Sequence, residues 1–124
     1  MIIGFHTLIY SEDPVATRAF FRDVLGFPCV DAGGGWLIFA LPPGELGVHP
    51  THEEGAPPVK PGRHKAMLMC SNIHATVNDL KAKGVEFTTG ISDEGWGLLS
   101  AFRLPGAGAL DLYEPRHPTM LPKA

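Results

Sequence analysis

Residues 13–27 read DPVATRAFFRDVLGF, and this stretch has the features of a short amphipathic helix. Asp13 belongs to the residue types that cap helix N-termini, Pro14 stands at the favoured first helical position, and Gly26 is a typical stop signal. The apolar residues between them recur at helical spacing: Ala16, Ala19, Phe20 and Val24. The stretch predicts one helix that begins after Asp13 and ends at Gly26.

Residues 72–85, NIHATVNDLKAKGV, repeat this pattern in the second half of the chain. Asn72 is the capping residue, an Ala-Thr pair follows it at the same offset as in the first copy, and Gly84 ends the pattern. Ile73, Val77 and Leu80 form the apolar stripe. The chain therefore contains an internal repeat.

Strand candidates surround both predicted helices in the same order. In the first half they are residues 2–10 before the helix, and 27–31, 36–40 and 46–49 after it. In the second half they are residues 66–70, and then 85–88, 98–104 and 109–114. A Leu-Pro-(Pro)-Gly bend joins the last two strands of each half. The repeated unit is β-α-β-β-β, which predicts an α+β fold.

The composition fits one domain made of these two modules. The chain has 124 residues, of which 15 are Gly and 12 are Pro, and 44% are hydrophobic, which is enough apolar surface to form a core. We place module one at about 1–50, a Pro-rich linker at about 51–63 and module two at about 64–118.

Charge and hydropathy exclude several classes of partner. The net charge is −3, so we expect no nucleic-acid binding. The apolar runs are too short to cross a membrane, no secretory signal is visible, and the two cysteines indicate no disulfide scaffold. These observations predict a cytoplasmic protein without membrane contact.

Paired βαβββ units, with His6 seven residues before the Asp13 cap and a Glu-Pro pair at 114–115, resemble the vicinal oxygen chelate superfamily. That superfamily includes glyoxalase I, extradiol dioxygenases and bleomycin-resistance proteins. The resemblance implies two modules that curve into a half-open eight-stranded barrel-like sheet. It also implies a cleft for a metal or a small-molecule ligand, and a homodimer.

The same resemblance implies positions for metal ligands. They fall on His6 in the first strand, and on His49 and Glu114 in the fourth strands of the two modules. Counting seven residues back from Asn72 gives Lys65 for the remaining position, and a protonated amine is a poor ligand. Two interpretations stay open. A bulge turns His64 inward to complete a set of His6, His64 and Glu114, or the cleft holds no metal.

Two functions follow from these alternatives. The first is a metal-dependent enzyme acting on a small molecule with neighbouring oxygens, with His49 and Tyr113 as catalytic candidates. A site of two histidines and one carboxylate favours Fe²⁺ or Mn²⁺, with Zn²⁺ or Ni²⁺ as alternatives, and favours dioxygenase chemistry over lyase or isomerase chemistry. The second is a metal-free binding protein of the bleomycin-resistance type. We expect His52, His74 and His117 to be exposed to solvent.

Overall fold

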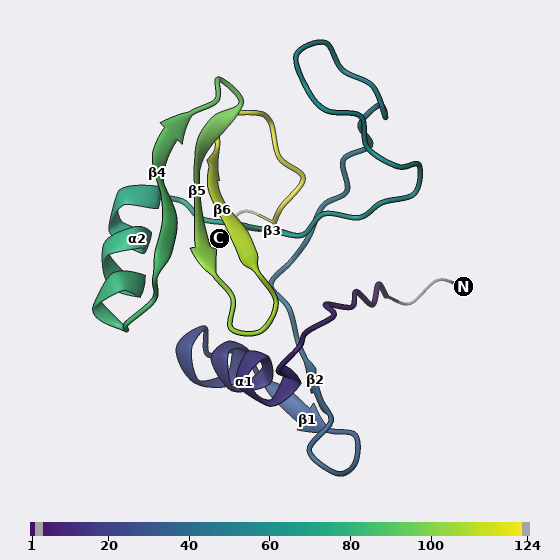
Figure 1. The fold of residues 1–124 in the computed structure, drawn as a ribbon, viewed down its shortest axis with the longest axis vertical. Helices are drawn as coiled ribbons and strands as arrows, with labels where there is room; N and C mark the ends of the chain where they lie inside the picture. Colours follow the sequence, from purple (N-terminus) through teal and green to yellow (C-terminus); the bar gives the residue numbers. More distant parts are fainter. Residues whose placement is uncertain (2–3, 123–124) are drawn as a thin grey trace.

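The computed structural model describes residue 1 and residues 4–122, and it shows an α+β fold with two separate sheets (Figure 1). The predicted fold class is therefore confirmed. The elements follow one another in this order: α1 (Pro14–Ala19), η1 (Phe20–Val24, a π-helical turn), β1 (Cys29–Asp31), β2 (Leu37–Phe39), β3 (Met67–Met69), α2 (Ile73–Ala82), β4 (Phe87–Asp93), β5 (Gly97–Arg103) and β6 (Ala109–Pro115).

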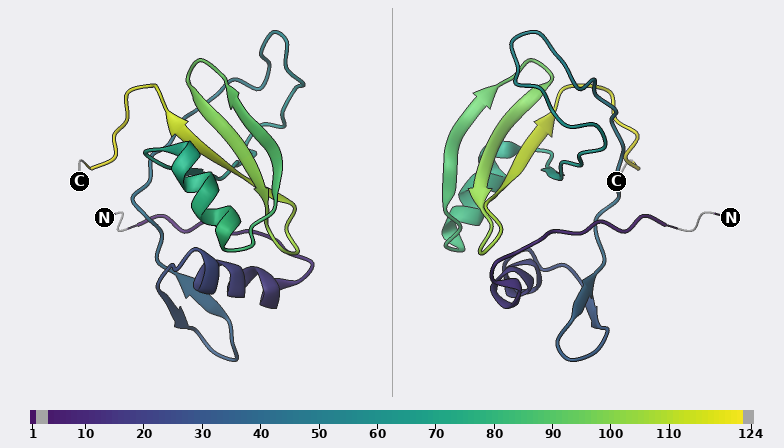
Figure 2. Two further views of the ribbon diagram at one scale, coloured as in Figure 1. Left: turned by 90° about the vertical axis from the view of Figure 1, so that its left-hand side faces the viewer. Right: turned by 45° about the vertical axis from the view of Figure 1, so that its right-hand side comes forward.

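The second repeat forms a complete βαβββ unit. Its four strands lie in the order β3-β6-β5-β4, with β3 parallel to β6 and the other neighbours antiparallel. Helix α2 lies along one face of this curved sheet (Figure 2). The β5–β6 register runs without interruption from the Gly97 and Pro115 pair to the Arg103 and Ala109 pair. The succession of elements along the chain matches the β-α-β-β-β unit that the sequence predicts for module two.

The hydrophobic core fills the space between α2 and the sheet. Phe102 of β5 is fully buried, and Phe20 stacks on it with ring centroids 5.8 Å apart. Because Phe20 belongs to η1, the first repeat contributes to the core of the second. The other buried apolar members are Ile73, Val77, Leu80, Val85, Leu104, Leu110 and Leu112.

Both predicted helices form where their caps indicate. The Asp13 carboxylate accepts a hydrogen bond from the Ala16 amide at 3.1 Å, and the Asn72 side chain accepts one from the Ala75 amide at 3.1 Å. These bonds satisfy amide groups that a helix N-terminus leaves without partners. The first helix continues as η1 up to Val24 and does not reach Gly26 as a regular α-helix.

The first repeat is less complete than the sequence predicts. Only β1 and β2 form, as a short antiparallel pair, and no strand forms in residues 4–10 or 41–50. Residues 2–3 of the first predicted strand lie outside the described part. The described chain therefore has six of the eight predicted strands. A strand needs a hydrogen-bonded neighbour, and the segments 4–10 and 46–49 have none among the described residues.

A tight junction connects the first helix to the β5–β6 turn. The Glu12 amide donates to the Gly106 carbonyl at 2.8 Å, and the buried Thr17 hydroxyl donates to the Pro105 carbonyl. Gly106 has φ of +76°, and a Cβ placed on it would lie 2.5 Å from Ser11 Oγ. The turn can approach the N-terminal segment this closely because Gly106 has no side chain. Among the described residues, no helix is long and apolar enough to span a membrane.

Candidate functional site

The face of the four-stranded sheet opposite α2 carries the candidate site, and we call it the open face. Cross-strand partners share a face, so the register defines its side chains in two rows. One row contains Thr89, Ala101, Asp111 and Met67, and the next contains Ser92, Leu99, Tyr113 and Met69. The alternate residues of β5 and β6, such as Phe102 and Leu110, face the core. The open face therefore combines apolar side chains with polar ones in about equal number.

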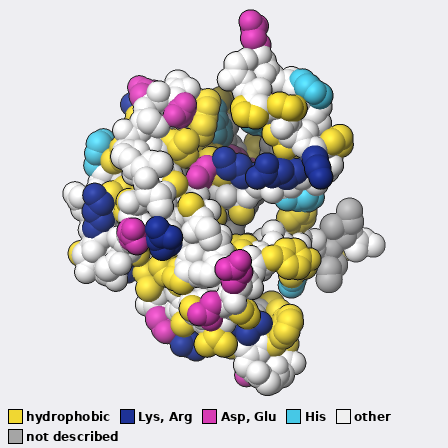
Figure 3. All heavy atoms as spheres, viewed as in Figure 1, with side chains coloured by type: hydrophobic (Ala, Val, Ile, Leu, Met, Phe, Trp, Pro, Cys, Tyr) yellow, Lys and Arg dark blue, Asp and Glu magenta, His cyan; other side chains and the backbone are white. Residues whose placement is uncertain are grey.

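One ion pair lies on this face. The Lys65 ammonium is 2.9 Å from the Asp111 carboxylate, whose side chain is 20% exposed, while the Lys65 side chain is 66% exposed. Lys65 lies just before β3, and Asp111 lies in the middle of β6 beside Met67. A carboxylate this far buried is costly without a partner, and the lysine supplies one. In the space-filling view, basic and acidic side chains meet beside a hollow between the sheet and a neighbouring loop (Figure 3).

Aromatic side chains gather at Tyr113. Its ring makes an edge-to-face contact with Trp96 at a centroid distance of 5.3 Å, and lies 5.8 Å from the His117 ring. The Tyr113 hydroxyl is 3.2 Å from His117 Nε2, and His117 Nδ1 is 2.8 Å from the Pro118 carbonyl oxygen. A carbonyl only accepts, so in the neutral ring Nδ1 carries the hydrogen and Nε2 accepts a hydrogen bond from the Tyr113 hydroxyl. The phenol oxygen is then left with its lone pairs.

The chemistry of Tyr113 follows from its burial. Burial raises the pKa of the Tyr113 phenol, and the negative charge of Glu45 raises it further. The phenol is therefore protonated at neutral pH and acts through hydrogen bonds. The Glu45 carboxylate also accepts a hydrogen bond from the Met120 amide at 2.9 Å.

The segment after β6 is fixed to the same end of the sheet. The Arg116 amide donates to the Trp96 carbonyl at 2.9 Å, and the Arg116 guanidinium donates to Asp93 at 2.9 Å. The Gly95 amide and the Arg116 side chain both hold the pKa of the Asp93 carboxyl below its usual range. These contacts hold His117 against Tyr113.

Glu114, a predicted metal ligand, faces α2. It pairs across the sheet with Leu98, and its carboxylate accepts a hydrogen bond from the Ile73 amide at 3.0 Å. Glu114 does share a face with Leu110 and Leu112, as the strand period predicts, and that face is the one the helix covers. Its carboxylate satisfies the first turn of α2.

The predicted histidines lie apart from Glu114. His6 is exposed in the N-terminal segment, and His64 is exposed just before β3, where Lys65 and not His64 contacts the open face. His49 is exposed, with Nδ1 3.9 Å from the Glu53 carboxylate. Within residue 1 and residues 4–122, no three His, Cys, Asp or Glu side chains come close enough together to hold a metal ion. The metal site of His6, His64 and Glu114 stays a prediction, because the described part of one chain does not bring these three side chains together.

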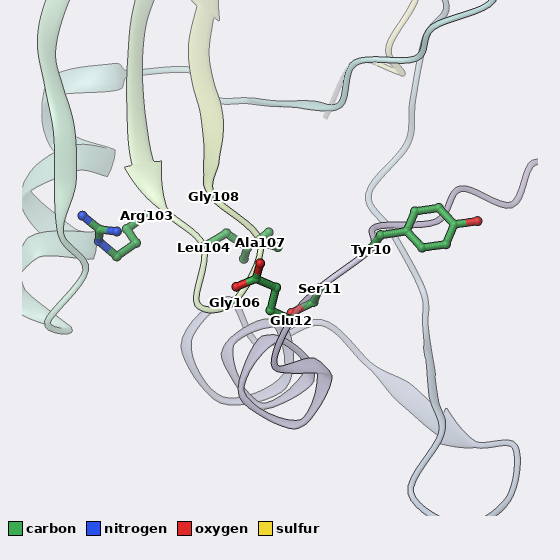
Figure 4. Close-up of a pocket in the computed structure, with 8 residues that line it drawn as sticks. All are labelled: Tyr10, Ser11, Glu12, Arg103, Leu104, Gly106, Ala107 and Gly108. Atoms are coloured by element: carbon green, nitrogen blue, oxygen red, sulfur yellow. The ribbon is translucent and has the colours of Figure 1, made fainter.

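A second hollow, of about 640 Å³, lies beside the β5–β6 turn (Figure 4). Residues 10–12 line one side of it and residues 103–108 the other. Its polar side chains diverge: Tyr10 points away from the turn, and Arg103 pairs with Glu86 at 3.0 Å. A binding pocket needs convergent polar groups, so the open face is the better candidate.

Sequence reasoning missed two residues of the open face. Asp111 lies between Leu110 and Leu112, and this alternation placed it opposite the core-facing leucines. That signal was available, since a lone acid within an apolar strand needs a partner. His117 was expected to be exposed, and no local pattern indicates its bond to Tyr113.

The profile of the Glyoxalase/Bleomycin resistance protein/Dioxygenase superfamily matches residues 5–116. The chain belongs to this superfamily. The match covers both repeats, including the incompletely paired first one. No curated protein sequence matches the chain.

Several solved structures share the fold. TnmS3, an antibiotic binding protein from Streptomyces sp. CB03234, is 20% identical with a TM-score of 0.57, covering 93% of this chain and 98% of that one. Lactoylglutathione lyase from Agrobacterium tumefaciens is 16% identical with a TM-score of 0.53, covering 87% and 90%. A superfamily member from Nocardioides is 16% identical with a TM-score of 0.55, covering 99% and 93%. At these identities the likeness concerns the fold.

Proposed function

We propose that this superfamily member is a metal-independent binding protein for a small, partly aromatic molecule, with the open face as its binding surface. The Lys65–Asp111 ion pair is the observation that carries the proposal. Lys65 takes the position that corresponds to His6 in the repeat, and its ammonium neutralises the carboxylate on this face. An ammonium group donates hydrogen bonds and has no lone pair for a metal.

The described residues do not fit a divalent metal. Glu114 is bonded to the start of α2, Asp111 is paired with Lys65, and the histidines lie apart. Dioxygenase or lyase chemistry of the kind predicted from the sequence would need these groups to meet. TnmS3 supports the binding alternative in one respect, because it is described as an antibiotic binding protein on the same fold.

The side chains of the open face indicate the chemistry of the ligand. Met67, Met69 and Leu99 offer an apolar floor, and thioether sulfur packs well against aromatic rings. The Tyr113 oxygen presents lone pairs to a donor, while the Lys65 ammonium, although paired with Asp111, offers hydrogen-bond donors. We infer a flat, partly aromatic ligand that carries an anionic or hydrogen-bonding group.

The anionic aromatic dye 1-anilinonaphthalene-8-sulfonate (ANS) is a suitable probe. We expect saturable fluorescence enhancement that is unchanged by EDTA. Ala101→Trp places a large ring among the floor residues and should abolish the enhancement. Val30→Trp, on the exposed strand β1, is the matched control and should bind as the wild type does. Loss of binding in EDTA, or equal binding by both variants, would contradict the proposal.

The role of Lys65 can be measured with the same probe. Lys65→Met should weaken dye binding by roughly 1.5- to 5-fold, because an exposed ion contact contributes about 0.2–1 kcal/mol. Lys83→Met removes an equal charge at the C-terminal end of α2 and should leave the affinity unchanged. Equal effects of the two substitutions would show that only the net charge matters.

A further inference from the structure

We propose that His117 is a specificity-determining residue of the open face, and that through Tyr113 it selects ligands that bring a hydrogen-bond donor, such as a phenol or an aryl amine. The inference rests on the proposed function, because it concerns the ligand of the same surface. Tyr113 lies near the end of β6, and His117 follows just after that strand. The direction of one phenol hydrogen decides which ligands fit.

The hydrogen bonds of this pair run in one direction, from Tyr113 through His117 to the backbone. The Pro118 carbonyl oxygen, 2.8 Å from His117 Nδ1, can only accept, so Nδ1 carries the hydrogen of the neutral ring. Nε2, 3.2 Å from the Tyr113 oxygen, then has only a lone pair and accepts the hydrogen bond. Because a hydroxyl has a single hydrogen, the phenol offers a ligand only lone pairs.

Contacts on both sides hold the Tyr113 ring in this position. Trp96 packs edge-to-face against it at a centroid distance of 5.3 Å, and the His117 ring lies 5.8 Å away with the two planes 31° apart. Gly97 permits this packing, since a Cβ added to it would lie 3.2 Å from Tyr113 Cδ2. The phenol oxygen is therefore fixed in place, and a ligand has to adapt to it.

Glu45 reinforces the preference for a donor. Burial, and then the negative charge of Glu45, raise the pKa of the Tyr113 phenol, so the phenol keeps its hydrogen at neutral pH. The Glu45 carboxylate accepts the Met120 amide at 2.9 Å and has further lone pairs. An ether or carbonyl oxygen placed here would face lone pairs and a negative charge, whereas a hydroxyl or amine hydrogen is attracted by both.

The opposite polarity is found further along β6. Asp111 precedes Tyr113 by two residues, which separates them along the strand by about 7 Å. There the Lys65 ammonium, 2.9 Å from the Asp111 carboxylate, offers hydrogen-bond donors. A ligand that spans both positions carries an acceptor at the Lys65 end and a phenol or aryl amine at the Tyr113 end.

Two naphthalenes that differ in one group test the inference. The hydroxyl of 2-naphthol donates a hydrogen bond, whereas the oxygen of 2-methoxynaphthalene only accepts one. Each compound competes with ANS at pH 8, where a free imidazole is neutral, and the ratio of the two inhibition constants is the readout. We expect the wild type to bind 2-naphthol roughly 2- to 10-fold more tightly, which is the effect of one neutral hydrogen bond.

Variants assign this preference to the pair of residues. His117→Phe keeps a ring against Tyr113 but has no nitrogen to accept, so the phenol hydrogen turns to the ligand and the ratio falls to one or below. Tyr113→Phe removes the hydroxyl and should also abolish the preference, which provides a second variant should the first not fold. His74→Phe changes an exposed histidine on α2, which covers the opposite face of the sheet, and should keep the wild-type ratio.

The outcomes separate this inference from the proposed function. Saturable dye binding with a wild-type ratio of one overturns the role of His117 and leaves the binding surface standing. A ratio that either substitution, at position 113 or at position 117, leaves unchanged has the same consequence. Absence of saturable dye binding overturns the proposed function and this inference together.

Discussion

Replacing Gly106 with alanine should break the junction between the N-terminal segment and the β5–β6 turn. At φ of +76° an alanine costs about 1–2 kcal/mol. Its Cβ would also lie 2.5 Å from Ser11 Oγ and 2.8 Å from the Asp13 amide nitrogen, so the segment has to move. The shift would break the hydrogen bond from Glu12 to Gly106, worth about 1 kcal/mol. The total loss is roughly 2–3 kcal/mol.

Gly108 is the matched control for this substitution. Its φ of +74° is almost the same, but nothing lies within 4 Å of the position of an added Cβ. Gly108→Ala should therefore cost only the backbone term of about 1–2 kcal/mol. At about 4 °C per kcal/mol, Tm should fall by roughly 8–12 °C for Gly106→Ala and 4–8 °C for Gly108→Ala in calorimetry. Equal losses would refute the close approach.

Three further outcomes are expected. Phe102→Ala removes the fully buried ring between Phe20 and Phe87 and should lower the free energy of unfolding by about 3–5 kcal/mol in urea titrations; a loss below about 1 kcal/mol would show that the core lies elsewhere. Burial raises the pKa of the Cys70 thiol, so iodoacetamide at pH 8 should alkylate it more slowly in the folded than in the unfolded protein, and equal rates would contradict its placement. Asp93 has a folded pKa below its ordinary value of 3.8, so its contribution to stability is present above that pH and is lost as pH falls through the folded value. The stability difference between wild type and Asp93→Asn should accordingly vanish in acid, and a difference that persists there would exclude the Gly95 amide and the Arg116 guanidinium as its cause.

The elements with local signals could be predicted from the sequence. The side chains of Asp13 and Asn72 mark helix starts because each accepts a hydrogen bond from the backbone amide three residues later. Such a hydrogen bond needs no partner that is distant in the sequence. The β5–β6 hairpin is likewise fixed by its own turn. The strands predicted at 2–10 and 46–49 are rich in residues that favour strands. A strand also needs a neighbouring strand to pair with, and composition does not specify which segment that is.

The candidate site could not be predicted from the sequence, because it is formed by contacts between distant segments that strand period and residue spacing do not specify. Strand period grouped Glu114 with Leu110 and Leu112 correctly, but only packing decides that α2 covers that face. Asp111 and Lys65 are 46 residues apart in the chain and meet because β3 runs parallel to β6. The sequence therefore defines the two faces of β6, and the tertiary fold selects the open one.

Metal content tests the central claim most directly. The measurement uses full-length protein purified without an affinity tag, first as isolated and then after anaerobic addition of Fe²⁺ or Mn²⁺ and removal of the excess. The account predicts a metal-to-protein ratio near zero in both samples, with dye binding retained. A ratio near one that falls on substitution of His6, His64 or Glu114 by alanine would contradict it and establish the metal site that the superfamily resemblance implies.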